Sequence, residues 1–140
     1  MSVQEADDLL NKRLGLLGLS GRSSDMKDLL DAEASDPRAA EAIAGFLHQG
    51  RKCLAGMAAS LGGLDLLVFT AGMGERSAPV RARLCAGLEF LGIRLDEARN
   101  VAGESVISAD DSPVSVRVMK TNEELMIARQ TFAAIESART

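Results

Sequence analysis

The sequence contains no tryptophan and no tyrosine, and its 3% aromatic content is all phenylalanine. Platforms that stack the bases of single-stranded nucleic acid are built from aromatic side chains, and 4 phenylalanines are too few to make one. The 16 lysines and arginines are outnumbered by 20 aspartates and glutamates, so the net charge is −4. A chain without a basic excess lacks the groups that neutralise a phosphate backbone. These two shortages exclude a nucleic-acid partner.

Histidine, long apolar runs and cysteine are also scarce. The single histidine, His48, is insufficient for a histidine-based metal site or a Ser-His-Asp triad. No run approaches the roughly 20 apolar residues that cross a bilayer, and no secretory signal precedes the first predicted helix. Cys53 and Cys85 lack metal-ligand spacing and are interpreted as small buried residues in a reducing compartment. The sequence therefore predicts a cytoplasmic protein without a membrane segment, about one domain in length.

Helix signals occur along the whole chain. Ser2 and Glu5 form a capping box, and Asp36 followed by Pro37 is a strong start for a long helix that ends at Gly62. The predicted elements, in order, are a helix from residue 3, a glycine- and serine-rich loop over 15–25, a long helix over 37–61, a strand over 64–70, a turn over 71–77, a helix over 78–91, a short strand at 106–107, a strand over 114–118, and a last helix from 121.

The predicted strand over 64–70 is rich in apolar residues and flanked by glycines, which is typical of a central strand covered on both faces. Two strand–loop–helix units indicate an α/β architecture. In the last helix, the spacing of Leu125, Ala128, Phe132 and Ile135 predicts an inward apolar face. Two or three strands are too few for so much helix, because an apolar strand needs hydrogen-bonding neighbours. The chain is therefore expected to be part of a domain.

The sharpest candidate site is the segment over 70–77, directly after the apolar strand. Gly72 and Gly74 let the backbone approach a phosphate or ribose closely, and ligands of α/β folds lie at the carboxyl ends of strands. The segment lacks the third glycine of a dinucleotide fingerprint and the Lys-Ser/Thr of a P-loop. An ordinary strand-to-helix turn needs the same glycines, so ligand binding and turn geometry explain the pattern equally well.

Two further segments could take part in binding. Thr121 and Glu124 are explained by capping of the last helix, whereas Glu123 is not needed for the cap and could hold Mg²⁺ at the same sheet edge. A solvated glutamate favoured by the helix dipole is the simpler interpretation of Glu123. The segment over 18–27 could wrap a ligand, with Asp25 as a hydrogen-bond acceptor, or could instead be a loop that ends in an N-cap at Ser24 or Asp25.

Four motifs occur together in an order that resembles one family. They are NKxxGLLGLSG over 11–21 leading into SSDMK over 23–27, VFTAGMGE over 68–75, CxGLEFLGI over 85–93 and TNEEL over 121–125. Together they are similar to the C-terminal portion of the acetate, propionate and butyrate kinase family, over essentially the whole chain. The resemblance implies a partial ribonuclease-H-like α/β fold of the actin, Hsp70 and sugar-kinase superfamily. Residues 1–140 would be a single segment, the second half of the C-terminal domain.

The resemblance also implies a reaction: reversible, ATP-dependent phosphorylation of a short-chain carboxylate such as acetate, which yields acetyl phosphate and ADP and requires Mg²⁺. It places Glu123 in the Mg²⁺ environment. The implied nucleotide-binding residues are Asp25, Met26, Lys27, Gly72, Met73, Gly74, Glu75 and Arg76. No catalytic residue is expected in this chain, because the family's catalytic arginines, aspartate and histidine lie in an N-terminal part that has no match here.

Two positions depart from the family pattern. Lys27 stands where the family usually has arginine, and Arg76 stands where it usually has asparagine. An arginine at this place could pair with phosphate in bidentate fashion or could obstruct the usual pose of the nucleotide.

Because the N-terminal domain is absent, the chain is expected to need that missing half or to form a homo-oligomer. A non-catalytic nucleotide-binding or self-associating remnant is the alternative.

Overall fold

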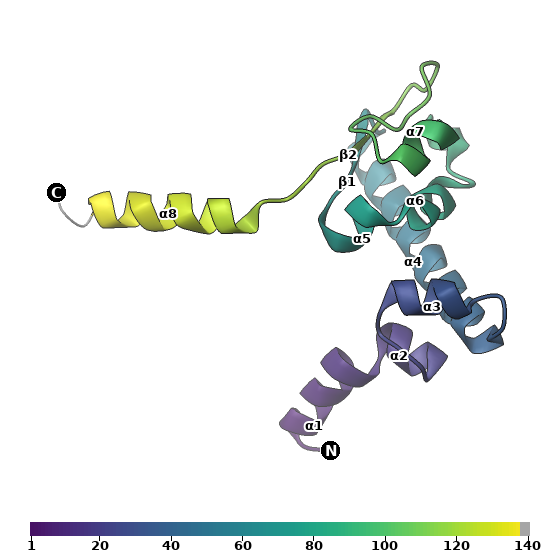
Figure 1. Cartoon of the computed structure of the whole chain (residues 1–140), viewed down its shortest axis with the longest axis vertical. Coiled ribbons are helices and arrows are strands. Elements are labelled where there is room, and N and C mark those ends of the chain that lie inside the picture. Colours follow the sequence, from purple (N-terminus) through teal and green to yellow (C-terminus); the bar gives the residue numbers. More distant parts are fainter. Residues whose placement is uncertain (138–140) are drawn as a thin grey trace.

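A computed structural model describes residues 1–137, with the side chain of Glu123 outside that description. Helices dominate, and two short strands lie among them (Figure 1). The elements are α1 (Val3–Asp8), a π-helical turn (Leu9–Arg13), α2 (Gly15–Ser20), α3 (Met26–Ala32), α4 (Pro37–Leu61), β1 (Leu66–Phe69), α5 (Ala71–Arg76), α6 (Ala78–Cys85), a 3-10 turn (Glu89–Leu91), α7 (Glu97–Ala102), β2 (Ser115–Val118) and α8 (Glu123–Ser137). Within residues 1–137, no helix combines the length and apolar character that a membrane span requires.

Helix α4, 25 residues long, connects two separate hydrophobic cores. The Asp36 side chain accepts hydrogen bonds from the Arg38 and Ala39 amides, and Gly62 ends the helix at a φ of 78°, so both predicted ends are confirmed. The first half of α4 packs in one core with α3. Its second half reaches a core that it shares with β1, β2 and α6. The helix therefore fixes the start of α3 relative to the sheet.

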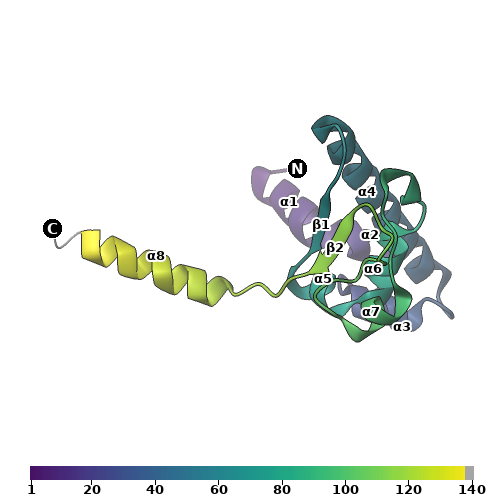
Figure 2. The same ribbon diagram turned by 90° about the horizontal axis from the view of Figure 1, so that it is seen from above.

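Strands β1 and β2 pair in parallel, with Phe69 opposite Val118, and form a two-stranded sheet within the described chain. Helices α4, α6 and α7 lie to one side of this sheet (Figure 2). Leu67 and Phe69 pack in the core on that side, whereas Leu66 and Val68 are 47% and 38% exposed. The predicted coverage of both faces is therefore wrong for the described chain, and the sheet is that of a partial α/β domain.

Several other predicted elements differ from the structure. The loop predicted over 15–25 contains helix α2, because Gly15 (φ 68°) and Gly21 (φ 65°) bound a helix instead of interrupting one. The turn predicted over 71–77 contains the short helix α5. The helix predicted over 78–91 ends at Cys85, and Gly87 (φ 82°) lies between α6 and the 3-10 turn. In place of the short strand predicted at 106–107, Val106 forms an isolated antiparallel bridge with Arg117, and helix α7 is not among the predicted elements.

Helix α8 leads away from the rest of the chain in both views (Figures 1 and 2). The inward orientation predicted for its apolar stripe is wrong. Leu125, Phe132 and Ile135 are 44%, 64% and 48% exposed, and Ala128 is exposed as well. The described residues leave this face of α8 uncovered, because α8 extends away from the sheet and its helices.

Candidate functional site

Two of the predicted segments meet in one cavity near the carboxyl end of β1. The first turn of α3 and helix α5, more than 40 positions apart in the sequence, line a cavity of about 550 Å³. Its lining includes six of the predicted site residues: Asp25, Met26, Lys27, Gly72, Met73 and Arg76. Several hundred Å³, with mostly apolar walls and a few charged groups, is typical of a small-molecule pocket. The structure thus brings together two segments that only the family resemblance had linked.

The first turn of α3 is held firmly at the cavity. Asp25 Oδ1 accepts a hydrogen bond from the Lys27 amide at 2.7 Å, which confirms the capping alternative for Asp25. The Asp25 amide in turn donates to Ser23 Oγ at 3.0 Å. Met26 is 5% exposed and packs in the core with α4. Because the cap uses only Oδ1, the second carboxylate oxygen of Asp25 remains available to a ligand.

Gly72 and Gly74 have different surroundings. A Cβ on Gly74 would lie 3.2 Å from the Phe69 carbonyl carbon, so the backbone of α5 can lie this close to the end of β1 only because Gly74 has no side chain. A Cβ on Gly72 would meet nothing within 4 Å, and Gly72 lines the cavity. Packing therefore explains Gly74, whereas Gly72 leaves open space on the side where a ligand would sit.

Ala71, the first residue of α5, has a left-handed backbone conformation with a φ of 59°. Every other positive φ in the described chain belongs to glycine. An L-residue is disfavoured in this region by roughly 1–2 kcal/mol, and such strain persists where the surrounding structure imposes it, often at ligand sites. The turn from β1 into α5 is therefore held in a fixed, strained geometry.

The substitution Ala71→Gly is expected to stabilise the chain by about 0.5–1 kcal/mol, because relief of the left-handed strain outweighs the extra flexibility of glycine in the unfolded chain. Thermal unfolding followed by circular dichroism measures the effect. Ala44→Gly in the interior of α4 is the control, and it should lower the midpoint by a similar amount. A lower midpoint for both variants would contradict the interpretation.

Three charged side chains besides Asp25 line the cavity: Lys27 and Asp31 on α3, and Arg76 on α5. Lys27 Nζ lies 3.4 Å from Asp31 Oδ2 in an exposed ion pair, which contributes little to stability. Arg76 reaches the cavity from α5, and its guanidinium makes no hydrogen bond or ion pair with any described residue. A guanidinium is well suited to bidentate contact with a phosphate. Leu30 and Pro79 complete the apolar wall, and no pattern in the sequence marks either of them as a site residue.

Glu75 is turned away from this cavity and connects α5 to the segment after β2. Its Oε1 accepts hydrogen bonds from the Thr121 amide at 2.9 Å and from Thr121 Oγ1 at 3.1 Å. These bonds, the backbone one above all, lower the pKa of the Glu75 carboxyl. The predicted capping role of Thr121 is wrong, because Asn122 Oδ1 accepts from the Leu125 amide instead. The contact brings the glycine segment and the start of α8 to one edge of the sheet.

Glu123, which the resemblance assigns to Mg²⁺, is the first residue of α8, but its side chain lies outside the described residues. Among the side chains that the structure describes, no group of three or more His, Cys, Asp or Glu converges as a metal site. Mg²⁺ is usually bound through one or two protein carboxylates together with phosphate oxygens and water. A single carboxylate is compatible with that chemistry, and the assignment of Glu123 to Mg²⁺ stays a prediction.

Arg81, on α6, is a buried charged residue that the sequence analysis missed. It is 2% exposed and is the largest of the fully buried side chains. Its Nη1 donates to the carbonyl oxygens of Gly74 at 3.0 Å and Glu75 at 2.9 Å. Its Nη2 and Nε donate to the backbone and side-chain oxygens of Asn100 at 2.6 and 2.8 Å. No local signal distinguishes this arginine from its neighbour Arg83, which forms a half-exposed pair with Glu33.

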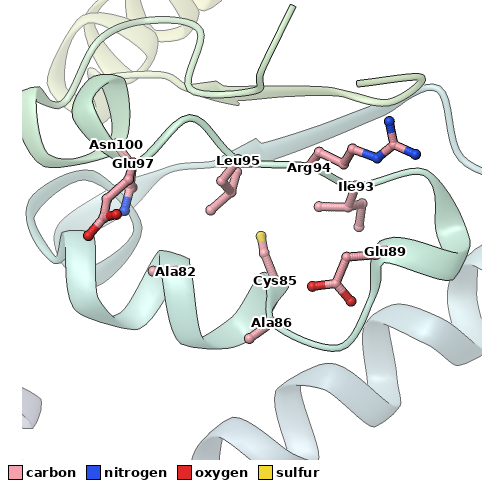
Figure 3. Close-up of a pocket in the computed structure, with 9 residues that line it drawn as sticks. All are labelled: Ala82, Cys85, Ala86, Glu89, Ile93, Arg94, Leu95, Glu97 and Asn100. Carbon is pink, nitrogen blue, oxygen red and sulfur yellow. The ribbon is translucent and has the colours of Figure 1, made fainter. Parts of the chain in front are cut away.

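A second hollow of about 390 Å³ lies between α6 and the segment 93–100 (Figure 3). Cys85 points into it from α6, and Glu89 and Glu97 stand at its margins. Burial raises the pKa of the Cys85 thiol to about 12, because a thiolate is poorly solvated there. The thiol is therefore protonated at neutral pH and is a poor nucleophile. None of the predicted site residues lines this hollow.

The two cysteines are expected to react with iodoacetamide at very different rates. Cys53 is exposed on α4, so its predicted burial is wrong, whereas Cys85 is 4% exposed and its predicted burial is confirmed. Alkylation of the native chain should modify Cys53 alone, and denaturation should make Cys85 reactive as well. Intact-mass spectrometry gives the number of labels, with Cys53→Ser as the control. Rapid labelling of Cys85 in the native chain would contradict this expectation.

Comparison with known proteins identifies the family to which the chain is similar. The model of the acetokinase family matches residues 1–129. The acetate kinase of Coprothermobacter proteolyticus is 51% identical over 96% of this chain, and a propionate kinase of Citrobacter rodentium is 48% identical over 92% of it. The crystal structure of Porphyromonas gingivalis acetate kinase superposes on 96% of the chain with a TM-score of 0.86 and 37% identity.

The mixed α/β fold with its small parallel sheet is thus part of the fold of acetate and propionate kinases. The chain belongs to the acetokinase family. It spans about a third of the length of these relatives, namely 34% of the Coprothermobacter proteolyticus protein and 35% of the Porphyromonas gingivalis structure.

Proposed function

We propose that this chain supplies the nucleotide-binding end of an acetate kinase-like phosphotransferase, which transfers a phosphoryl group from ATP to a short-chain carboxylate such as acetate. The observation that carries the proposal is the cavity in which the first turn of α3 meets α5. Residues 1–140 act as one segment of the larger enzyme. Both cysteines are free, which is in keeping with a reducing, cytoplasmic compartment.

The cavity offers the contacts that an adenine nucleotide needs. Met26, Met73 and Pro79 supply apolar surface for a planar base, and Asp25 supplies an acceptor for a ribose hydroxyl or a base amino group. Arg76 supplies a guanidinium for a phosphate. Mg²⁺, when bound, would neutralise phosphate charge, with Glu123 as its protein ligand. Glu75 then contributes through its contact with Thr121 instead of through the nucleotide.

Titration calorimetry with ATP and Mg²⁺ tests the proposal through Gly72→Val. The valine side chain would extend into open space at the cavity without meeting the fold, so it should weaken ATP binding by about tenfold or more. Gly74→Val is a poor probe, because its side chain would press on the Phe69 backbone and disturb folding.

Gly56→Val is the matched control for this titration. Gly56 is also a helical glycine whose Cβ would meet nothing within 4 Å, but it lies on α4 and does not line the cavity. Its substitution should leave the affinity for ATP within about twofold of the parent chain. Equal affinities for Gly72→Val and Gly56→Val would remove α5 from the nucleotide site.

A further inference from the structure

Arg81 is buried without an acidic partner among the described residues. All four of its hydrogen bonds go to neutral oxygens, two from the last turn of α5 and two from Asn100 on α7. Burial lowers the pKa of its guanidinium, which nevertheless stays charged at physiological pH because arginine titrates so far above neutrality. A buried charge is costly unless hydrogen bonds compensate it. The buried guanidinium therefore joins α5 to α7 through hydrogen bonds that an apolar side chain could not make.

Several contacts besides those of Arg81 hold α5: Met73 packs against the core that α3 and α4 share, and Gly74 lies close to the Phe69 backbone. A helix of six residues is too short to be stable by itself, so neighbouring groups must hold it in place. Its first residue, Ala71, is strained, and its Glu75 side chain reaches the segment before α8. Arg81 holds the carbonyls of Gly74 and Glu75 together, at the end of the helix where a positive charge is favourable.

We propose that Arg81 is the positioning residue of the cavity, which fixes α5 against α6 and α7 so that Gly72 and Arg76 stand at the distance from α3 that a nucleotide requires. Arg81 does not line the cavity, so it acts through α5 and not by touching the ligand. The proposal rests on the proposed nucleotide site. The physical reason is that a helix already fixed in its binding position loses less conformational freedom when the ligand binds, so the ligand binds more tightly.

The experiment compares Arg81→Lys with the parent chain in two measurements. Lysine keeps the charge but cannot span four acceptors on two helices with its single ammonium group. Amide hydrogen exchange should become at least about tenfold faster in α5 and at Ser77, whose amide bonds to Met73. The affinity for ATP, measured by calorimetry, should fall by about tenfold.

Controls matched in stability separate positioning from a general loss of folding. Ile107 is fully buried in the core that includes β1 and β2 and lines neither hollow, so Ile107→Val and Ile107→Ala can bracket the thermal midpoint of Arg81→Lys. These controls should leave exchange in α5 and the ATP affinity within about twofold of the parent. Asn100→Ala removes one acceptor of Arg81, together with the bond from Asn100 Nδ2 to the Ala78 carbonyl, and should give a smaller change in the same direction as Arg81→Lys.

The outcomes are distinct. Faster exchange confined to α5 in Arg81→Lys, with unchanged exchange there in the stability-matched Ile107 variant, supports the positioning role. Unchanged exchange in folded Arg81→Lys, or equal changes in the Ile107 variant, overturns it. If Arg81→Lys does not fold, Asn100→Ala replaces it in the test: faster exchange in α5 than in the stability-matched Ile107 variant supports the positioning role, and unchanged or equal exchange overturns it. Absence of ATP binding to the parent chain would count against the proposed nucleotide site, while the exchange measurement would still decide whether Arg81 fixes α5.

Discussion

The purified 140-residue chain is expected to show no acetyl phosphate formation from acetate, ATP and Mg²⁺. Phosphoryl transfer depends on groups that position and neutralise the transferring phosphoryl, and one such arginine is worth roughly 10³–10⁵ in rate. The family resemblance places the catalytic arginines in the part of the relatives that this chain does not match. A hydroxamate assay for acyl phosphate measures the rate, which should be at least about a thousandfold below that of a full-length family enzyme.

Complementation provides the positive control for this expectation. Mixing the chain with the unmatched portion of the Coprothermobacter proteolyticus acetate kinase, to which it is 51% identical elsewhere, should give measurable turnover. The variant Gly72→Val in the same mixture should reduce that turnover, and Gly56→Val should not. Turnover by the chain alone within about tenfold of a full-length enzyme would show that these residues contain a complete catalytic apparatus.

Helix ends were predictable because their signals are local. The capping box of Ser2 and Glu5, the Asp36 cap and the Gly62 stop all appear in the structure as the sequence predicted. The same locality misled the interpretation of residues 15–25, where Gly15 and Gly21 mark the two ends of α2. A glycine at a positive φ indicates that the chain turns, but it does not say whether a helix lies on either side.

The contacts that build the site were not predictable from local patterns. Glu75 and Thr121 are 46 residues apart, so no local pattern links them. Capping of the next helix explains Thr121 in the sequence, and only the fold shows that its hydrogen bonds go to Glu75. Arg81 differs from Arg83 only in the face of α6 that it occupies, and that face is decided by α7, which the sequence did not reveal. The link between the first turn of α3 and α5 came from the family resemblance, since neither segment alone specifies the other.

Self-association at micromolar concentration is the other large effect expected of this chain. Strand β1 has no second neighbour in the described sheet, and Leu66 and Val68 on its open face are 47% and 38% exposed. Helix α8 presents Phe132, 64% exposed, on a second uncovered apolar face. An unpaired strand edge beside exposed apolar side chains is a template for association with another chain. Light scattering should therefore give a mass well above 14.8 kDa.

A single charge on the open face of β1 should weaken this association. Val68→Lys places an ammonium group beside the unpaired edge, which is how natural edge strands avoid pairing, and it should shift the measured mass toward the monomer. Met57→Lys is the control, because Met57 is an exposed apolar residue of α4, 69% exposed and away from the sheet edge. If the parent chain is a dispersed 14.8 kDa monomer with a cooperative melt, the open face of β1 is not an association surface. If both lysine variants dissociate the assembly equally, the association is a general effect of surface hydrophobicity, and the strand edge has no special part in it.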